Sequence, residues 1–204
     1  MTTLSPIALS QANESARGPT AYSHWVIPNL LLASAYPGQT DPDAHRRLTR
    51  QIIDAGVEVV VNIMEIEELK RFTPYQQTML EHAAEVDRQM EFISFPIRDQ
   101  SVHQDNQRVL EFCLELCERV KKGQVVLVHC WGGHGRTGTI ISIMIGILFN
   151  LNSKDAIAMN RQLHDQRVRT NGIPSPETGV QTKQIRIVLD EMYHKNKDQV
   201  KTEV

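Results

Sequence analysis

The sequence predicts one α/β domain with a central, twisted sheet of about four to five strands, mixed but mostly parallel, flanked by helices. Two features of its 204 residues lead to this prediction. Short apolar, β-branched runs recur between longer segments of helical periodicity, a pattern typical of strands and helices. One such run, at 125–128, passes into a cluster of glycines and then into an apolar run at 140–149. A strand, a tight loop and a buried helix should therefore follow one another near the centre of the fold.

Turn and capping residues place the elements of the first half. Pro28 and Asn29 interrupt an apolar segment, so we expect two short strands around a turn there. Asp41 and Pro42 are typical of a helix start, and Gly56 is typical of a helix end. The expected elements are two strands within 25–36, a helix over about 43–55, a strand over 57–64, a loop or short helix at 65–69, a helix from Thr73–Pro74 to about 90, and a strand over 91–97.

Apolar periodicity places the helices of the second half. A helix over 104–122 should have one apolar face, formed by Val109, Phe112, Cys113, Leu116, Cys117 and Val120. Because Cys113 and Cys117 lie on that face, we expect them to be core residues rather than metal ligands or redox partners. The apolar run after the glycines predicts a buried helix from 137 to about 150. A helix capped by Asn152 or Ser153 should follow, and then a last helix with Pro176 at its first position.

The glycine cluster has the properties of a phosphate-binding loop. Glycines let the backbone N–H groups ahead of a helix converge on one point, where the helix dipole also attracts an anion. Cys130 ends the strand before the loop, and Arg136 stands six positions later. A thiolate is a nucleophile that such a setting stabilises, and a guanidinium can bind two phosphate oxygens. A small core cysteine or an ordinary turn would explain only a part of this stretch.

This stretch resembles the signature of the cysteine-dependent protein tyrosine phosphatase superfamily, in its dual-specificity branch. The matching residues are His129 and Cys130, followed after five intervening residues by Arg136, Thr137 and Gly138. The resemblance extends more loosely from 25 to 192. It implies metal-independent hydrolysis of phosphomonoesters on phosphoproteins, on phosphotyrosine and also phosphoserine or phosphothreonine, through a cysteinyl-phosphate. It further implies that Cys130 attacks phosphorus, that Thr137 hydrogen-bonds to the Cys130 sulfur, and that His129 orients the loop. The implied phosphate-binding residues are Trp131, Gly132, Gly133, His134, Gly135 and Arg136.

The segment after the strand at 91–97 holds the expected general acid. In the family, a mobile loop about 30 residues before the nucleophile carries an aspartate that protonates the leaving oxygen. Asp99 stands at that spacing, and Asp105 is an alternative that is also placed to cap the next helix. Many relatives have proline directly before this aspartate, whereas this chain has Arg98, with Pro96 two positions earlier. On composition alone, Asp99 is a solvated loop residue.

The start of the last helix is a second place where the resemblance suggests site residues. The stretch Ser175–Thr178 followed by Gln181 is similar to one that lies beside the phosphate-binding loop in the family. The resemblance therefore brings Arg167, Arg169 and Gln181 toward the site. The alternative is that these three are ordinary surface and capping residues.

Other functions are compatible with parts of the motif. Relatives that hydrolyse phosphoinositides or inositol phosphates commonly place lysine on both sides of the central glycines, where this chain has Trp131 and His134. A non-catalytic phosphoprotein-binding module would be expected to lack Cys130 or Arg136. A sulfur transferase of the rhodanese type also places a cysteine ahead of a helix, but His129 favours the phosphatase.

Composition narrows the setting. The formal net charge of −2 gives no general attraction to nucleic acid or to an acidic membrane surface. The longest apolar run is far shorter than the roughly 20 residues that span a bilayer, so no stable membrane insertion is expected. Three cysteines indicate a reducing, cytoplasmic compartment rather than a disulfide framework. The histidines and cysteines show no metal-ligand spacing, and we expect neither a metal nor another cofactor.

The two ends differ in composition from the rest of the chain. We expect residues 1–20 to be a flexible segment without a signal peptide, 21–195 to form the catalytic domain, and 196–204 to be a polar tail. The last three residues, Thr202–Val204, resemble a peptide that adds a strand to a PDZ groove. A PDZ-type partner is therefore a further expectation, although so short a match also occurs by chance.

Overall fold

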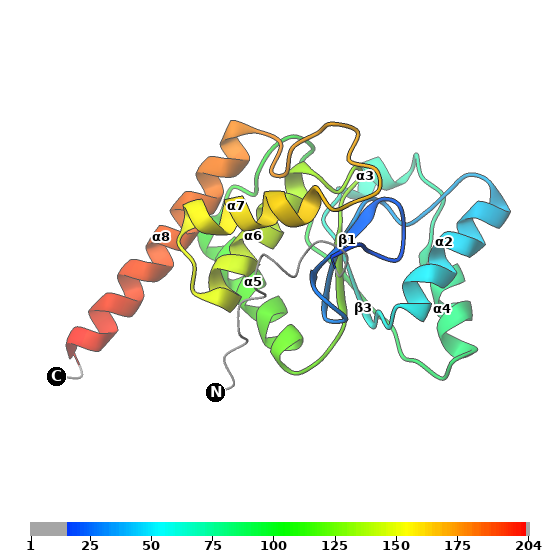
Figure 1. Cartoon of the computed structure of the whole chain (residues 1–204), viewed down its shortest axis with the longest axis horizontal. Coiled ribbons are helices and arrows are strands. Elements are labelled where there is room, and N and C mark those ends of the chain that lie inside the picture. The colour runs from blue at the N-terminus through cyan, green and yellow to red at the C-terminus, as the bar shows by residue number, and fades with distance from the viewer. Residues whose placement is uncertain (1–15, 203–204) are drawn as a thin grey trace.

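The computed structural model describes the backbone of residues 16–202 and the side chains of residues 16–192. The predicted PDZ-type motif at Thr202–Val204 depends on side chains that lie outside the described residues, and most of segment 1–20 lies outside them as well. The described residues form one sheet with helices on both of its faces (Figure 1).

In the described part of the chain, the sheet has five strands in the order β1-β2-β5-β3-β4. The strands are β1 (Ser23–Ile27), β2 (Leu31–Ser34), β3 (Val59–Asn62), β4 (Glu91–Ser94) and β5 (Val126–His129). β1 is antiparallel to β2, and all other neighbours are parallel. The predicted fold class is therefore confirmed. β5 lies between β2 and β3, so the residues that follow it emerge at the middle of the sheet.

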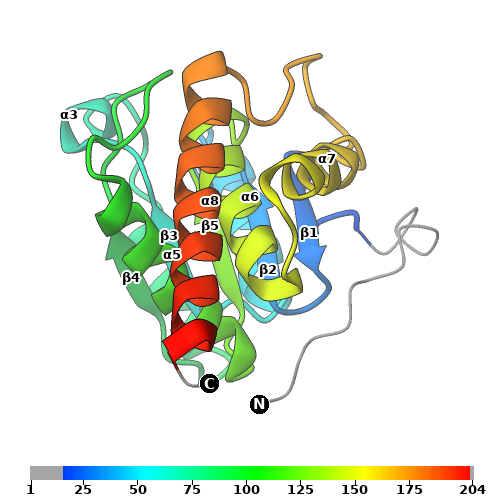
Figure 2. The same ribbon diagram turned by 90° about the vertical axis from the view of Figure 1, so that its left-hand side faces the viewer.

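The helices are α2 (Pro42–Asp54), α3 (Ile66–Leu69), α4 (Gln76–Ala84), α5 (Asn106–Lys121), α6 (Gly135–Phe149), α7 (Ser153–His164) and α8 (Gly179–Thr202). α2 and α4 lie on one side of the sheet, whereas α5, α6, α7 and α8 gather on the other (Figures 1 and 2). All residues of α6 except Ile147 are buried. A Cβ added at Gly146 would lie 2.6 Å from the Leu189 side chain, so α8 packs closely on α6 at this point. The helix that follows the glycine loop is thus buried along nearly its whole length and packs against α8.

Capping residues at three helix starts are as predicted. The Asp41 side chain accepts a hydrogen bond from the Ala44 N–H at 2.8 Å. Asp105 caps α5 and Asn152 caps α7 in the same way. Cys113 and Cys117 are fully buried, which confirms that both are core residues.

Two predicted helices have different bounds in the structure. α4 begins at Gln76 rather than at Thr73–Pro74, and it ends at Ala84 rather than near 90. Asp87 adopts a φ of 52°, and the Arg88 N–H donates to the Ala83 carbonyl at 2.9 Å, which closes the helix six residues early.

α8 begins at Gly179, so Pro176 lies before the helix rather than at its first position as predicted. The N–H groups of Glu177 and Thr178 donate to the Gln181 side chain. α8 runs to Thr202 and includes most of the segment predicted as a tail.

No single helix among residues 16–202 is both long and apolar enough to cross a bilayer; only α6 and α7 taken together, with a bend of 117° between them, meet the criteria of length and composition.

Candidate active site

The loop between β5 and α6 holds the predicted nucleophile. Cys130 follows the last residue of β5, and its side chain is buried at the carboxyl end of the parallel strands. The Gly133 N–H donates to the Cys130 Sγ at 3.2 Å. Gly133 has a φ of +71°, and a Cβ at this position would lie 2.5 Å from the Ser34 carbonyl oxygen. Only glycine therefore allows the loop to curl back over the sulfur at this point.

Arg136 is the charged group at the bottom of the site, with only 2% of its surface exposed. Its guanidinium donates to both carboxylate oxygens of Glu68, at 2.6 and 3.0 Å, and to the Ile97 carbonyl at 3.0 Å. Burial alone would lower the pKa of Arg136, but the hydrogen bonds to Glu68 and the nearby Cys130 raise it overall. The structure therefore fixes a permanent positive charge next to the predicted nucleophile.

Glu68 is a site residue that the sequence analysis missed. It lies in the short helix α3, within the acidic stretch that was predicted only as a loop or short helix. Burial would raise the pKa of the Glu68 carboxyl, but its hydrogen bonds with Arg136 lower it overall. A buried arginine needs a carboxylate partner, so the sequence could have indicated that an acidic residue binds Arg136. It could not have indicated which of the neighbouring glutamates in 65–68 does so.

Asp99 lies in the loop after β4 and faces the same site. Its Oδ1 is 2.8 Å from the Arg136 guanidinium, and 45% of its side chain is exposed. Asp99, Cys130 and Arg136 line one cavity of about 340 Å³. The structure thus brings the three predicted residues together from two separate segments, the loop after β4 and the β5–α6 loop with the first turn of α6. Asp105, the alternative acid, does not line this cavity and caps α5 instead.

The Asp99 loop is held to α8 by two glutamines. Gln181 donates to the Ser101 carbonyl at 3.4 Å, and Gln184 donates to the His103 carbonyl at 2.6 Å. Below the loop, the Phe95 ring stacks on the His103 ring with centroids 4.9 Å apart. These hydrogen bonds to α8 involve the main-chain oxygens of Ser101 and His103 and not the Asp99 side chain.

His129 is a buried, neutral residue at the end of β5. Burial lowers its pKa to about 4. Because the Cys130 carbonyl can only accept, Nδ1 of His129 donates to it at 3.2 Å, and Nε2 accepts from the Tyr75 hydroxyl at 2.7 Å. Burial raises the pKa of Tyr75, so its hydroxyl keeps its proton. Both ring nitrogens are thus engaged in positioning the backbone before the loop.

Arg167 supports the loop from behind rather than facing the cavity. Its guanidinium donates to the Gly133 carbonyl at 2.8 Å and to the Gly132 carbonyl at 3.3 Å. Nδ1 of His134 is 2.8 Å from Nε2 of His164, which ties the loop to the end of α7. With their carbonyl oxygens bound on this side, the loop peptides direct their N–H groups toward the cavity.

The other two residues suggested by the resemblance behave differently from Arg167. Gln181 lines the catalytic cavity. Arg169 does not line it, and instead donates to the Tyr22 hydroxyl at 3.0 Å.

Thr137 does not form the predicted hydrogen bond to sulfur. Its Oγ1 is buried and has no hydrogen-bond partner among the described residues. The Cys130 sulfur instead accepts from the Gly133 N–H. The predicted hydrogen bond between Thr137 and the Cys130 sulfur is therefore absent from this structure.

A family model described as "PTP-SAK: Swiss Army Knife protein, DSP-PTPase phosphatase domain" matches residues 20–185. The chain belongs to this family. The resemblance to the dual-specificity branch of the protein tyrosine phosphatases is thereby confirmed.

Known proteins similar to this DSP-PTPase domain differ from it in length. The putative tyrosine phosphatase 067L of Invertebrate iridescent virus 3 is 30% identical over 79 residues, which cover 37% of this chain and 33% of the viral protein. The protein tyrosine phosphatase domain-containing protein 1 of Mus musculus is 24% identical over 182 residues, which cover 82% of this chain and 22% of the mouse protein. The chain therefore spans a third or less of the length of these two curated relatives.

Solved structures show the same fold. The crystal structure of PTPMT1 in complex with PI(5)P superposes with a TM-score of 0.66 at 15% identity, covering 86% of this chain and 99% of that chain. At this level of identity the likeness concerns the fold alone.

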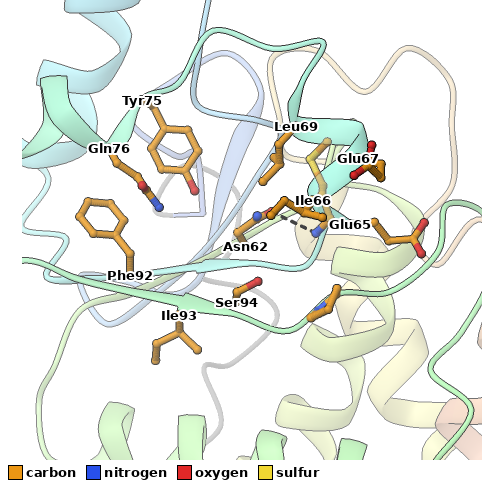
Figure 3. A pocket seen from close by; sticks show the side chains of 12 residues that line it. Asn62, Glu65, Ile66, Glu67, Leu69, Tyr75, Gln76, Phe92, Ile93 and Ser94 are labelled. Carbon is orange, nitrogen blue, oxygen red and sulfur yellow. Dashed lines mark hydrogen bonds between the residues drawn. The ribbon is translucent and has the colours of Figure 1, made fainter.

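A cavity larger than the catalytic one lies elsewhere among the described residues. It has about 510 Å³ and is bordered by α3, the start of α4 and the end of β4, with Tyr75, Phe92 and Leu69 directed into it (Figure 3). It contains none of Cys130, Arg136 and Asp99. The cavity of about 340 Å³ is the candidate active site, because Cys130, Arg136 and Asp99 line it together and can supply a nucleophile, a cation and an acid.

Proposed function

We propose that this chain is a metal-independent phosphatase that hydrolyses phosphomonoesters on proteins, with phosphotyrosine as the preferred group. The observation that supports this is the meeting of Cys130, Arg136 and Asp99 in one cavity. A second supporting observation is the match to the DSP-PTPase family over residues 20–185.

In the first step, the Cys130 thiolate attacks phosphorus in line with the leaving oxygen. A sulfur–phosphorus bond forms and the phosphorus–oxygen bond breaks, while Asp99 gives its proton to the leaving oxygen. The loop N–H groups and Arg136 bind the three equatorial oxygens and stabilise their charge in the transition state. Because Arg136 already supplies a fixed positive charge, the step does not require a metal.

The contact between Asp99 and Arg136 has a consequence for substrate binding. Without phosphate, the Asp99 Oδ1 is 2.8 Å from the Arg136 guanidinium. An entering phosphate dianion is a better partner for this guanidinium because it carries more negative charge than the Asp99 carboxylate. Phosphate then displaces Asp99, and the freed carboxylate takes up a proton from solvent and lies beside the leaving oxygen, where the acid is required.

In the second step, the cysteinyl-phosphate is hydrolysed. Asp99, now a carboxylate, takes a proton from a water molecule that attacks phosphorus, and the sulfur–phosphorus bond breaks. The Gly133 N–H, 3.2 Å from the sulfur, stabilises the thiolate as it leaves. Inorganic phosphate departs and the site returns to its starting state.

The lining of the cavity favours phosphotyrosine over phosphoinositides. Arg136 is the cation of the cavity, and Asp99 and Glu177 add carboxylates, so additional phosphates would be repelled. Trp131 lines the same cavity with 55% of its surface exposed, and it provides an aromatic wall for a phenol ring. His134 does not add charge, because burial lowers its pKa to about 4. The bound phosphoinositide in the PTPMT1 structure is the main support for the alternative substrate class.

The test is hydrolysis of p-nitrophenyl phosphate by the wild type beside Cys130→Ser, with a chelator present. Turnover by the wild type that the serine variant lacks would support the proposal. If neither protein turns over but Cys130→Ser binds a phosphotyrosyl peptide, the chain is a binding module. Formation of thiocyanate from thiosulfate and cyanide would instead indicate the sulfur transferase.

A further inference from the structure

A second cavity, which we call the flanking cavity, adjoins the catalytic one. It has about 390 Å³, and Trp131, Gly132 and Asn171 line both cavities. A substrate whose phosphate lies against Gly132 therefore has part of its remaining structure next to the flanking cavity. The two cavities form one bipartite site, of which the reaction uses only the catalytic half.

Aromatic rings form the wall of the flanking cavity. The rings of Phe72 and Trp131 meet edge to face with centroids 6.1 Å apart, and those of Tyr36 and Phe72 are 4.7 Å apart. These rings can cover the methylene groups of an extended peptide, because aromatic side chains bury large apolar areas on contact. Since Trp131 lines both cavities, a peptide can place its phenol ring on one side of Trp131 and a neighbouring residue on the other.

Arg71 is the cation of the flanking cavity. It is exposed, and its guanidinium has neither a hydrogen bond nor an ion pair among the side chains that the structure describes. Its charge does help to lower the pKa of Glu68. However, both Glu68 carboxylate oxygens are already bound to Arg136, so Arg71 keeps its hydrogen-bonding capacity for a ligand.

We propose that the flanking cavity binds an acidic side chain beside the phosphotyrosine of a peptide substrate, with Arg71 as the specificity-determining residue. This inference rests on the proposed function, because it concerns the same site and the same reaction. A guanidinium fork matches a carboxylate in two hydrogen bonds, and the aromatic wall accommodates the aliphatic stem of the acidic residue. A phosphoinositide would also bring an anion to Arg71, but its polar ring would lie against the aromatic wall.

The experiment compares three matched phosphotyrosyl peptides whose residues on both sides of the phosphotyrosine are glutamate, alanine or lysine. For the wild type, we expect kcat/KM for the glutamate peptide to exceed that for the alanine peptide by about fivefold, the upper range for a partly exposed ion pair. Arg71→Ala should reduce this ratio to about one, and Arg71→Glu should make the lysine peptide the better substrate. The quantity compared is the ratio of kcat/KM for two peptides with the same variant. A loss of folded or active protein lowers both values equally and therefore leaves the ratio unchanged.

The matched control is Arg47→Ala. Arg47 is an exposed arginine of α2 that lines neither cavity. Replacing it with alanine lowers the net charge of the protein by one, as Arg71→Ala does. The ratio in Arg47→Ala should equal that of the wild type. An equal drop in both variants would mean that the preference comes from overall charge, and it would overturn the role of Arg71.

Two further outcomes would contradict the proposal. A wild type with equal kcat/KM for the glutamate and alanine peptides has no acidic-residue site. A soluble phosphatidylinositol bisphosphate that is turned over faster than every peptide, in a manner dependent on Arg71, would assign the cavity to a lipid headgroup. If the wild type hydrolyses no phosphomonoester at all, the proposed function fails. The affinities of Cys130→Ser for the three peptides then still show whether Arg71 selects the acidic one.

Discussion

The two loops that form the catalytic cavity are held in different ways. Cys130 and residues 133–136 are buried, and Arg167 donates to the carbonyl oxygens of Gly132 and Gly133. The Asp99 loop lies at the surface, and the polar contacts that hold it to α8 are those of Gln181 and Gln184 with the Ser101 and His103 carbonyls. Most of the proposed phosphate-binding loop is therefore buried and preorganised, whereas the proposed acid, Asp99, lies on a surface loop.

We infer from this difference that phosphate binding and proton transfer depend on separate structural elements of the proposed site. A change in the buried loop should affect every substrate, because every substrate binds its phosphate there. A change in the exposed loop should affect substrates according to how much their leaving oxygen requires a proton. The predictions below test this separation.

The largest effect is expected for Arg136→Lys. Lysine keeps the charge but loses the planar fork that holds Glu68 and phosphate together, and kcat/KM should fall by about 10²- to 10³-fold. The fall should be the same for p-nitrophenyl phosphate and for a phosphotyrosyl peptide. Steady-state kinetics check this, with circular dichroism to show that the variant is folded. A tenfold difference between the two substrates would contradict a role in phosphate binding alone.

The next effect is expected for Asp99→Asn. Asparagine cannot donate the proton, so kcat for a phosphotyrosyl peptide should fall by about 10²-fold. The fall for p-nitrophenyl phosphate should be clearly smaller, because p-nitrophenolate leaves without full protonation. The matched control is Asp105→Asn, which changes the helix cap and should leave this contrast between substrates unchanged. Equal losses for both substrates in Asp99→Asn would remove Asp99 as the acid.

The histidines around the buried loop predict how stability depends on pH. Burial lowers the pKa of His129 and of His134 to about 4, and that of His164 to about 3. In the unfolded chain these groups take up protons near pH 6.5, so below that pH the unfolded state binds more protons. Stability should therefore be full above about pH 6.5 and fall progressively toward pH 4.

Urea unfolding at pH 7.5, 6.5 and 5.5 measures this fall before the carboxylates begin to titrate. His164→Asn should make the dependence shallower, because it removes one of the buried histidines. A free energy of unfolding that stays constant over this range would contradict the neutral, buried state of the cluster.

The smallest effect is expected for Gln184→Ala. It removes the hydrogen bonds to the His103 carbonyl at 2.6 Å and to the Asn106 Oδ1 at 2.9 Å, and it loosens the exposed loop without touching the phosphate site. We expect kcat for phosphotyrosyl peptides to fall by about threefold, because hydrogen bonds of roughly 0.5–1.5 kcal/mol each restrain the loop but do not contact the substrate. The inhibition constant of inorganic phosphate should stay unchanged. A weaker phosphate affinity in this variant would show that the two loops are not separate.

The same contrast explains which features could be predicted from the sequence. The strand, the glycines, Cys130 and Arg136 are neighbours in the chain, so local pattern was sufficient to predict the loop and its place in the sheet. Asp99 was found through family resemblance, because its distance from Cys130 in sequence carries no geometric information. Glu68 and Arg167 bind the loop across the fold, and no local pattern distinguishes them from other charged residues. The hydrogen bond expected from Thr137 to the Cys130 sulfur is absent from the structure, where the Gly133 N–H donates to the sulfur.

The most direct test of the central claim is to find the phosphoryl group during turnover. The wild type is mixed with a phosphotyrosyl peptide, denatured within milliseconds, and its peptides are examined by mass spectrometry. We expect a phosphoryl group on Cys130 of the wild type, and neither this adduct nor turnover in Cys130→Ser. Turnover with the phosphoryl group on another residue, or turnover that survives Cys130→Ser, would contradict the cysteinyl-phosphate mechanism.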